Sequence, residues 1–241
     1  MTEIRETLLP RLDSKDGPLP PLLIALTFVT GLVDSFSYLV LGHVFVANMT
    51  GNVVFLAFAL AGEKGFSVTF SILAIAAFVL GSFTAGRLHS RLAVHRGKLF
   101  VSTLLIQMSL VGIAVLLIAV SPKNPVPMDF GYGLVAGLAV CMGIQNATAR
   151  KLAVPDLTTT VLTLTMTGLG ADSHLAGGTG SKAGRRLLSI LSMFIGALVG
   201  ALMILYASIV YPLAIAFAIK VAVTLTAKFY SRGRPGWVSP K

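Results

Sequence analysis

GLVDSFSYLVLGHVFVANMTGN, residues 31–52, is a polar and glycine-interrupted stretch inside otherwise apolar sequence. A second stretch of this kind, GIQNATARKLAVPDLTTTVLTL, covers residues 143–164. A constant offset of 112 residues aligns the two and places Asp34 on Asn146. Polar, broken segments at matching positions of two halves of a membrane chain are the best indication in a sequence of a transport site.

The composition is that of a membrane protein. The mean hydropathy is +0.87, and 12% of the residues are charged, about half the share in a soluble domain. The net charge of +10 does not indicate nucleic-acid binding, because the cations lie in loops between apolar runs. The long apolar runs that predict spans are Leu22–Leu41, Phe66–Ala85, Leu99–Val120, Gly131–Ala149, Leu187–Tyr206 and about Leu213–Phe229.

Two weaker segments, Val44–Ala61 and Leu157–Ala171, follow the first and fourth runs. If both crossed the membrane as poorly hydrophobic helices, a strongly basic loop or tail would face outside, against the positive-inside rule. If both enter and return, six crossings remain with both termini inside, and only Lys64 and Lys123 lie outside. The cations then placed inside are Arg5, Arg11, Lys15, Arg87, Arg91, Arg96, Lys98, Arg150, Lys151, Lys182, Arg185, Arg186, Lys228, Arg232, Arg234 and Lys241.

The expected fold is therefore an all-α integral membrane protein of about six transmembrane helices plus two short broken or re-entrant segments. Three crossings in each half invert the second half relative to the first, so we expect two inverted repeats. The predicted organisation is a cytoplasmic tail (1–19), a single membrane domain (20–230, with repeats at about 20–120 and 129–230) and a basic tail (231–241).

Asp34 is the one acidic residue deep within an apolar run, and such residues are usually functional or tightly paired. It is expected either to bind a cation or proton, or to form an internal pair. Lys220, inside the last run, is the candidate partner; the alternative is that it extends towards the inner interface. The full set of candidate substrate- or ion-binding residues is Asp34, Tyr38, Asn48, Thr50, Asn52, Asn146, Thr159, Thr160, Thr163 and Lys220.

Hydroxyl and amide side chains in the broken segments suit a polar solute or an ion beside freed backbone carbonyls. The alternative is that these groups only satisfy irregular backbone at membrane depth. Small residues at Gly81, Gly196 and Gly200 predict close helix packing, within the bundle or in a homo-oligomer.

Signals for an enzyme are weak. The four histidines show no metal-binding spacing, and Gly177–Lys182 lacks the residues of a phosphate-binding loop. We expect neither catalysis, nor a metal, nor a cofactor.

The stretch VFVANMTGN, with GIQNATARKL and TTTVLT in the second half, resembles the YoaK family of bacterial multi-pass membrane proteins over about residues 20–230. Thr163 is followed by Leu164 where such families often have glycine. The resemblance implies a protein of the bacterial inner membrane and supplies no substrate. The residues themselves favour a secondary transporter or permease for a small solute, coupled to protons or cations, with membrane lipids as its other partners. The alternative is a lipid-binding or assembly factor whose polar core is structural.

Overall fold

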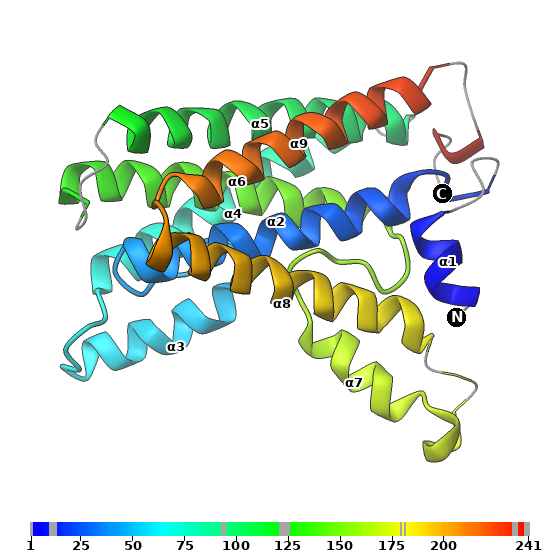
Figure 1. The fold of residues 1–241 in the computed structure, drawn as a ribbon, viewed down its shortest axis with the longest axis horizontal. Helices are drawn as coiled ribbons and strands as arrows, with labels where there is room; N and C mark the ends of the chain where they lie inside the picture. Colours follow the sequence, from blue (N-terminus) through cyan, green and yellow to red (C-terminus); the bar gives the residue numbers. More distant parts are fainter. Residues whose placement is uncertain are drawn as a thin grey trace.

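The computed structural model describes residues 2–9, 14–92, 95–120, 126–178, 180, 182–232 and 236–238, and all the regular elements in these ranges are helices (Figure 1). In chain order they are α1 (Thr2–Leu8), α2 (Leu19–Val40), α3 (Met49–Leu60), α4 (Val68–Leu92), α5 (Arg96–Val120), α6 (Met128–Leu152), α7 (Thr163–Ala171), η1 (His174–Ala176), α8 (Ala183–Tyr206), α9 (Tyr211–Tyr230) and η2 (Gly236–Val238).

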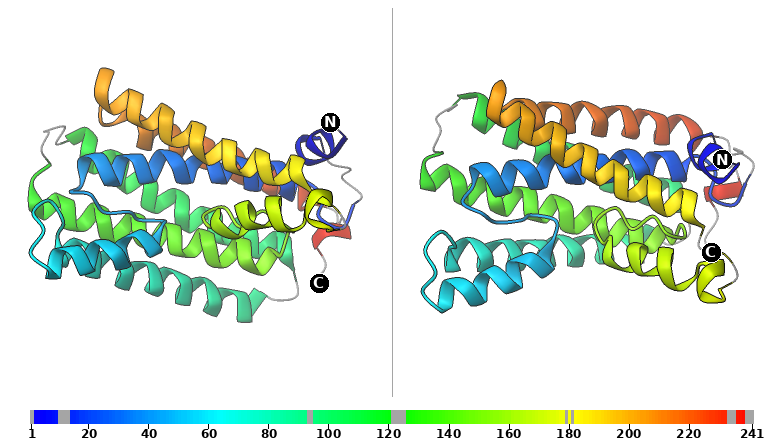
Figure 2. Two further views of the ribbon diagram at one scale, coloured as in Figure 1. Left: turned by 90° about the horizontal axis from the view of Figure 1, so that it is seen from below. Right: turned by 60° about the horizontal axis from the view of Figure 1, so that its bottom comes forward.

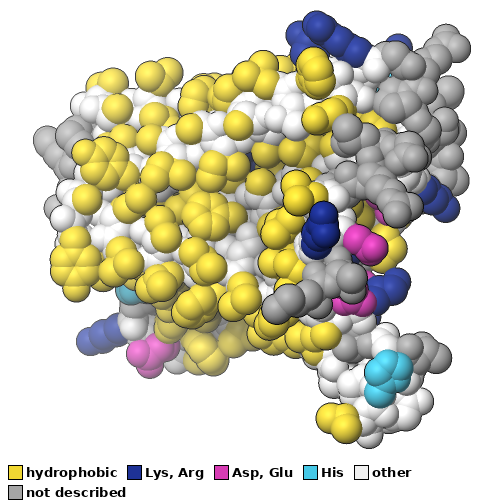
Figure 3. Space-filling view, turned by 45° about the vertical axis from the view of Figure 1, so that its right-hand side comes forward, with side chains coloured by type: hydrophobic (Ala, Val, Ile, Leu, Met, Phe, Trp, Pro, Cys, Tyr) yellow, Lys and Arg dark blue, Asp and Glu magenta, His cyan; other side chains and the backbone are white. Residues whose placement is uncertain are grey.

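Six of these helices are long and apolar enough to cross a membrane: α2, α4, α5, α6, α8 and α9. The shortest, α9, has 20 residues, which rise about 30 Å and match the hydrocarbon thickness of a bilayer. Figure 3 shows apolar side chains covering the flank of the bundle, with charged side chains gathered towards its ends. The predicted all-α, multi-pass fold is confirmed, with about the expected number of spans.

Helices α2 and α6 form the centre of the bundle, where α2 packs against α8 and α6 packs against α4. Glycine allows both crossings. A Cβ at Gly81 would overlap the Val140 carbonyl, and a Cβ at Gly196 would overlap the Phe28 carbonyl. Val140 lies 112 residues after Phe28, so the two crossings use corresponding positions of the two halves. Small residues are needed here because the backbones approach within the reach of a methyl group.

The three glycines expected at close helix contacts lie at contacts within the chain. Gly81, Gly196 and Gly200 are buried against helices of the same chain. They explain close packing inside the bundle, which is the first of the two expected roles.

Helices α2 and α6 run in opposite directions (Figure 1). Helix α2 leaves the end of the bundle that holds both termini, whereas α6 runs towards that end (Figure 1). The short helices α3 and α7 lie at opposite ends (Figures 1 and 2). Arg96, at the start of α5, donates to the carbonyls of Lys15 (3.0 Å), Trp237 (3.2 Å) and Leu152 (2.6 Å), and so gathers both terminal regions at one end.

Candidate functional site

The first broken segment, residues 44–61, enters the bundle and returns to the same end. After α2 the chain turns at Gly42, which has a φ of +86°, and runs without regular structure to α3. His43, which precedes α3, has its Nδ1 atom 3.1 Å from the carbonyl oxygen of Gly65, which follows α3. The 12 residues of α3 rise about 18 Å, well short of a bilayer core of about 30 Å. Figure 2 shows the segment reaching the middle of the bundle and returning.

The second broken segment, residues 157–171, is also closed at one end, here by ion pairs. Asp156 precedes it and Asp172 follows it, and Arg186 of α8 binds both carboxylates at 2.8 Å. The nine residues of α7 rise about 14 Å, again too little to cross. Residues 157–171 therefore also return to the end from which they came, opposite to the end used by α3 (Figure 2).

Asp34 fastens the first broken segment to α2. Its Oδ1 atom accepts hydrogen bonds from the backbone N–H groups of Val46 (3.1 Å) and Ala47 (2.9 Å). Its Oδ2 atom accepts from the side-chain amide of Asn48. Asp34 is only 5% exposed. The buried carboxylate thus satisfies two backbone N–H groups that no helix or sheet satisfies at this depth, and one side-chain amide.

Asn52 fixes the same segment from the other side. Its Oδ1 accepts from the backbone N–H of Phe45 (2.9 Å), and its Nδ2 donates to the carbonyl of Phe45 (2.6 Å). Both ends of the amide are thus used within the segment. Thr50 is exposed. Of the three polar residues predicted from this run, Asn48 is therefore the one that faces a cavity.

A cavity of about 280 Å³ lies between α2, α8 and the broken segment. Its one charged lining group is Asp34, accompanied by the polar side chains of Ser35, Tyr38 and Asn48. Its lining residues are Gly31, Asp34, Ser35, Tyr38, Leu39, Phe45, Asn48, Met193, Ala197 and Ala201. A mostly apolar wall with a few convergent polar groups is typical of a small-molecule site. Asp34, Tyr38 and Asn48 are the sequence-predicted residues that the fold brings together.

The second half presents different chemistry at the matching positions. Asn146 is half-buried. Thr159 and Thr160 are buried, and their hydroxyls lack a partner among the described residues. Thr159 has a φ of +65°, an uncommon conformation for a β-branched residue. Thr163 is exposed at the start of α7. The second segment therefore carries unpaired hydroxyls where the first is fastened by a carboxylate.

The predicted pairing of Lys220 with Asp34 is wrong. The Nζ atom of Lys220 lies 2.7 Å from the Oε1 atoms of both Gln107 and Gln145. The side chain is also fully buried, so it does not extend to the interface. Sequence reasoning missed both partners, although they are the two glutamines of the chain and each lies within a long apolar run.

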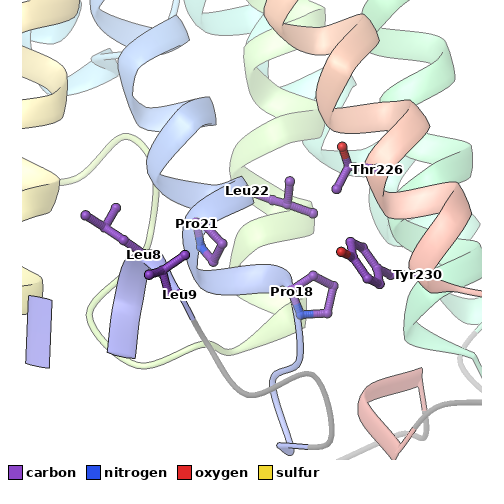
Figure 4. Close-up of a pocket in the computed structure, with 7 residues that line it drawn as sticks. All are labelled: Leu8, Leu9, Pro18, Pro21, Leu22, Thr226 and Tyr230. Carbon is purple, nitrogen blue, oxygen red and sulfur yellow. The ribbon is translucent and has the colours of Figure 1, made fainter. Parts of the chain in front are cut away.

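A second cavity, also about 280 Å³, lies at the end that holds the termini (Figure 4). Its lining residues are Leu8, Leu9, Pro18, Pro21, Leu22, Thr226 and Tyr230. None of them is charged at neutral pH, so this cavity offers less chemistry than the one beside Asp34. Within the described ranges, no three His, Cys, Asp or Glu side chains gather to hold a metal ion.

Comparison with known proteins places the chain in a family. The family described as "Protein of unknown function (DUF1275)" matches residues 22–226. The chain is also 32% identical over 153 residues to "UPF0700 transmembrane protein YoaK" of Bacillus subtilis (strain 168). That match covers 63% of this chain and 65% of the relative, so it spans just under two thirds of the relative's length. No solved structure matches.

Proposed function

The chain belongs to this DUF1275 family, and from the geometry of its broken segments we propose that it is a secondary transporter or permease for a small solute. The observation that carries the proposal is the pair of short segments closed at opposite ends of one bundle. Irregular backbone at membrane depth is tolerated only where it is buried in protein or lines a water-filled path. Two such segments, one from each face, are a recurrent way to build a substrate site near the midplane.

The two halves are proposed to be inverted repeats. Matching glycine contacts support this, since Gly81 meets Val140 as Gly196 meets Phe28. The opposite directions of α2 and α6 support it as well (Figure 1). In such an arrangement the α4–α6 pair and the α2–α8 pair are equivalent, and each takes the place of the other when the protein changes state. Rocking one half against the other then opens each end in turn.

The solute is proposed to sit beside Asp34. Asp34 lines the cavity, and its carboxylate is held there by N–H groups of residues 46–48. A small neutral solute with a hydrogen-bond donor, or a small organic cation, fits this chemistry. Tyr38 and Asn48 supply further polar contacts, and the volume of about 280 Å³ limits the solute to a small molecule.

The proposed location is the bacterial inner membrane, with both termini in the cytoplasm. Arg96 gathers the basic α4–α5 connection and both terminal regions at one end. The first turn of α8, with Arg185 and Arg186, lies at the same end, where Gly184 donates to Glu3 of α1. An end this rich in Arg and Lys faces the cytoplasm under the positive-inside rule.

Transport by purified protein in liposomes tests the proposal. Small neutral solutes such as urea and glycerol are followed by light scattering, and small amines such as methylammonium by radiolabel uptake, with internal pyranine reporting proton movement. Uptake of at least one class above that of empty liposomes is expected. Asn48→Ala removes the side-chain donor that orients the Asp34 carboxylate and should lower this uptake about tenfold, the loss expected for one hydrogen bond to a charged group.

Thr50→Ala is the matched control, because Thr50 lies two residues away on the same segment and is exposed. It should transport like the wild type. Absence of uptake across the panel, or unchanged uptake in Asn48→Ala, would contradict the proposal. A protein that transports nothing but binds lipid in these liposomes would point to the lipid-binding alternative.

A further inference from the structure

Lys220 occupies an unusual place for a lysine. It is the tenth of the 20 residues of α9 and is fully buried. Its Nζ atom points into the bundle, at 2.7 Å from Gln107 of α5 and from Gln145 of α6. An isolated ammonium ion buried away from water is so costly that such a group gives up its proton unless a counter-charge or water compensates it.

The orientation of the Gln145 amide is fixed by its other contacts. Its Nε2 donates to the backbone carbonyl of Leu26 (3.2 Å), which can only accept. It also donates to Thr30 Oγ1 (3.0 Å), whose own hydrogen is directed to the Leu26 carbonyl (3.1 Å). The Gln145 Oε1 atom therefore faces Lys220 and accepts a hydrogen bond from it.

The site around Lys220 is short of acceptors. The Gln145 and Gln107 oxygens account for two N–H groups of the lysine. The Nε2 group of Gln107 is itself buried without an acceptor among the described residues. A charged lysine has three N–H donors and would leave one more unsatisfied, whereas an uncharged amine has two and offers a lone pair. The hydrogen-bond count fits the uncharged amine.

No carboxylate among the described residues compensates a charge at Lys220. Helix α5 contributes Gln107, and α6 contributes Gln145 and the thiol of Cys141, which donates to the Gln107 carbonyl (3.7 Å). Helix α2 contributes Thr30, and its one carboxylate, Asp34, is bound to residues 46–48 instead. The charged residues of α8 are Arg185 and Arg186 in its first turn, which bind Thr7 and Asp156. On α9 itself, Thr224 donates to the Lys220 carbonyl.

We propose that Lys220 is a proton-binding site: its amine is uncharged in this closed arrangement of the bundle and takes up one proton when the core opens to water. The proton adds to the Nζ lone pair and raises the charge of the core by one. The chain of contacts Lys220–Gln145–Thr30 ends one turn before Asp34 on α2, which would link this proton to the cavity. That link rests on the proposed transport, whereas the proton site does not.

Stability as a function of pH tests the site without any solute. A lysine in the unfolded chain keeps its proton below about pH 10. If Lys220 is uncharged when folded, the unfolded state binds one more proton than the folded state, so folding stability rises with pH. Thermal unfolding of the purified wild type and of Lys220→Met in detergent, between pH 6 and pH 9, should show this difference. Relative to the variant, the wild-type folding equilibrium constant should rise about tenfold per pH unit.

Lys228→Met is the matched control, since Lys228 lies on the same helix two turns later and is exposed. It should keep the wild-type pH dependence. A structural role alone would lower the unfolding temperature of Lys220→Met equally at every pH. Parallel pH profiles for the wild type and Lys220→Met, or a wild type that loses relative stability as pH rises, would overturn the proposal.

Gln107→Glu keeps the test usable if Lys220→Met fails to fold. It retains the lysine and places a carboxylate beside it, so an ion pair should form and the rise in stability with pH should disappear. An unchanged wild-type slope in Gln107→Glu would also overturn the proposal. Neither measurement depends on transport, so a failure of the uptake experiment and a failure of the proton site are separate results.

Discussion

The carboxylate of Asp34 accepts the backbone N–H of Ala47 at 2.9 Å, and this contact joins the middle of a long helix to the segment that leads into α3. Asp34→Ala would remove the carboxylate that accepts three hydrogen bonds, and would leave the three donors without a partner at a buried position. Each unsatisfied donor costs about 1–3 kcal/mol, so we expect a loss of about 3 kcal/mol or more in the free energy of unfolding, measured by thermal unfolding in detergent. Asp34→Asn, which keeps one acceptor oxygen, should lose less.

The glycine crossings predict a second pattern of stability. Gly81→Ala and Gly196→Ala each place a Cβ against a backbone carbonyl of the neighbouring helix, so the helices must separate. Overpacking of this kind costs about 1–3 kcal/mol, and unfolding temperatures should fall in both variants. Gly137→Ala is the control, because a Cβ there meets nothing within 4 Å; in a helix it should be neutral or stabilising by up to about 1 kcal/mol. Equal behaviour of all three variants would contradict the proposed crossings.

Removal of the Arg186 ion pairs should loosen the second broken segment and leave the first unchanged. Arg186→Gln removes the charged partner of both Asp156 and Asp172, so peptides covering α7 should exchange their amide hydrogens faster. Peptides covering α3 should be unaffected, because that segment is held by Asp34 and Asn52. Lys151→Gln, a change at an exposed cation near the same end, should leave both segments as they are. Unchanged exchange in α7 would show that packing, and not the ion pairs, holds it.

Accessibility of single cysteines tests the topology. In a Cys141→Ala background, single cysteines that replace Arg91 and Leu175 should be labelled from one side of the membrane. A cysteine that replaces Glu63 should be labelled from the other side. The reason is that Glu63 follows α3, whereas Leu175 follows α7, and the two short helices lie at opposite ends (Figure 1). A membrane-impermeant maleimide applied to whole cells and to inverted vesicles makes the measurement. Labelling of Glu63 and Arg91 from one side would exclude six crossings.

The positions of the spans and of the broken segments were predictable, because long apolar runs and the polar interruptions between them are local properties of sequence. A tight internal pairing of Asp34, one of the two expected roles, was predictable because an acid within a long apolar run needs partners. Its partners were not, because a lone acid and a lone base in different spans suggest a pair, whereas backbone N–H groups leave no mark in a sequence. Gln107 and Gln145 were overlooked as uncharged residues, although a buried amide needs partners as a charge does.

The side chains of the second segment were harder to predict. Thr159 and Thr160 are buried while Thr163 is exposed, and nothing in a run of threonines indicates which way each hydroxyl points. The left-handed backbone at Thr159 turns the chain at this place. Such a conformation in a β-branched residue depends on the surrounding packing and not on local preference.

The two closures of the broken segments differ in kind. One joins His43 to a backbone carbonyl, and the other consists of ion pairs from Arg186 to two aspartates. Dissolved salt weakens the attraction between partly exposed charges, such as that between Arg186 and Asp172. We therefore expect the contact that closes the second segment to weaken as the ionic strength rises at the end that holds the termini.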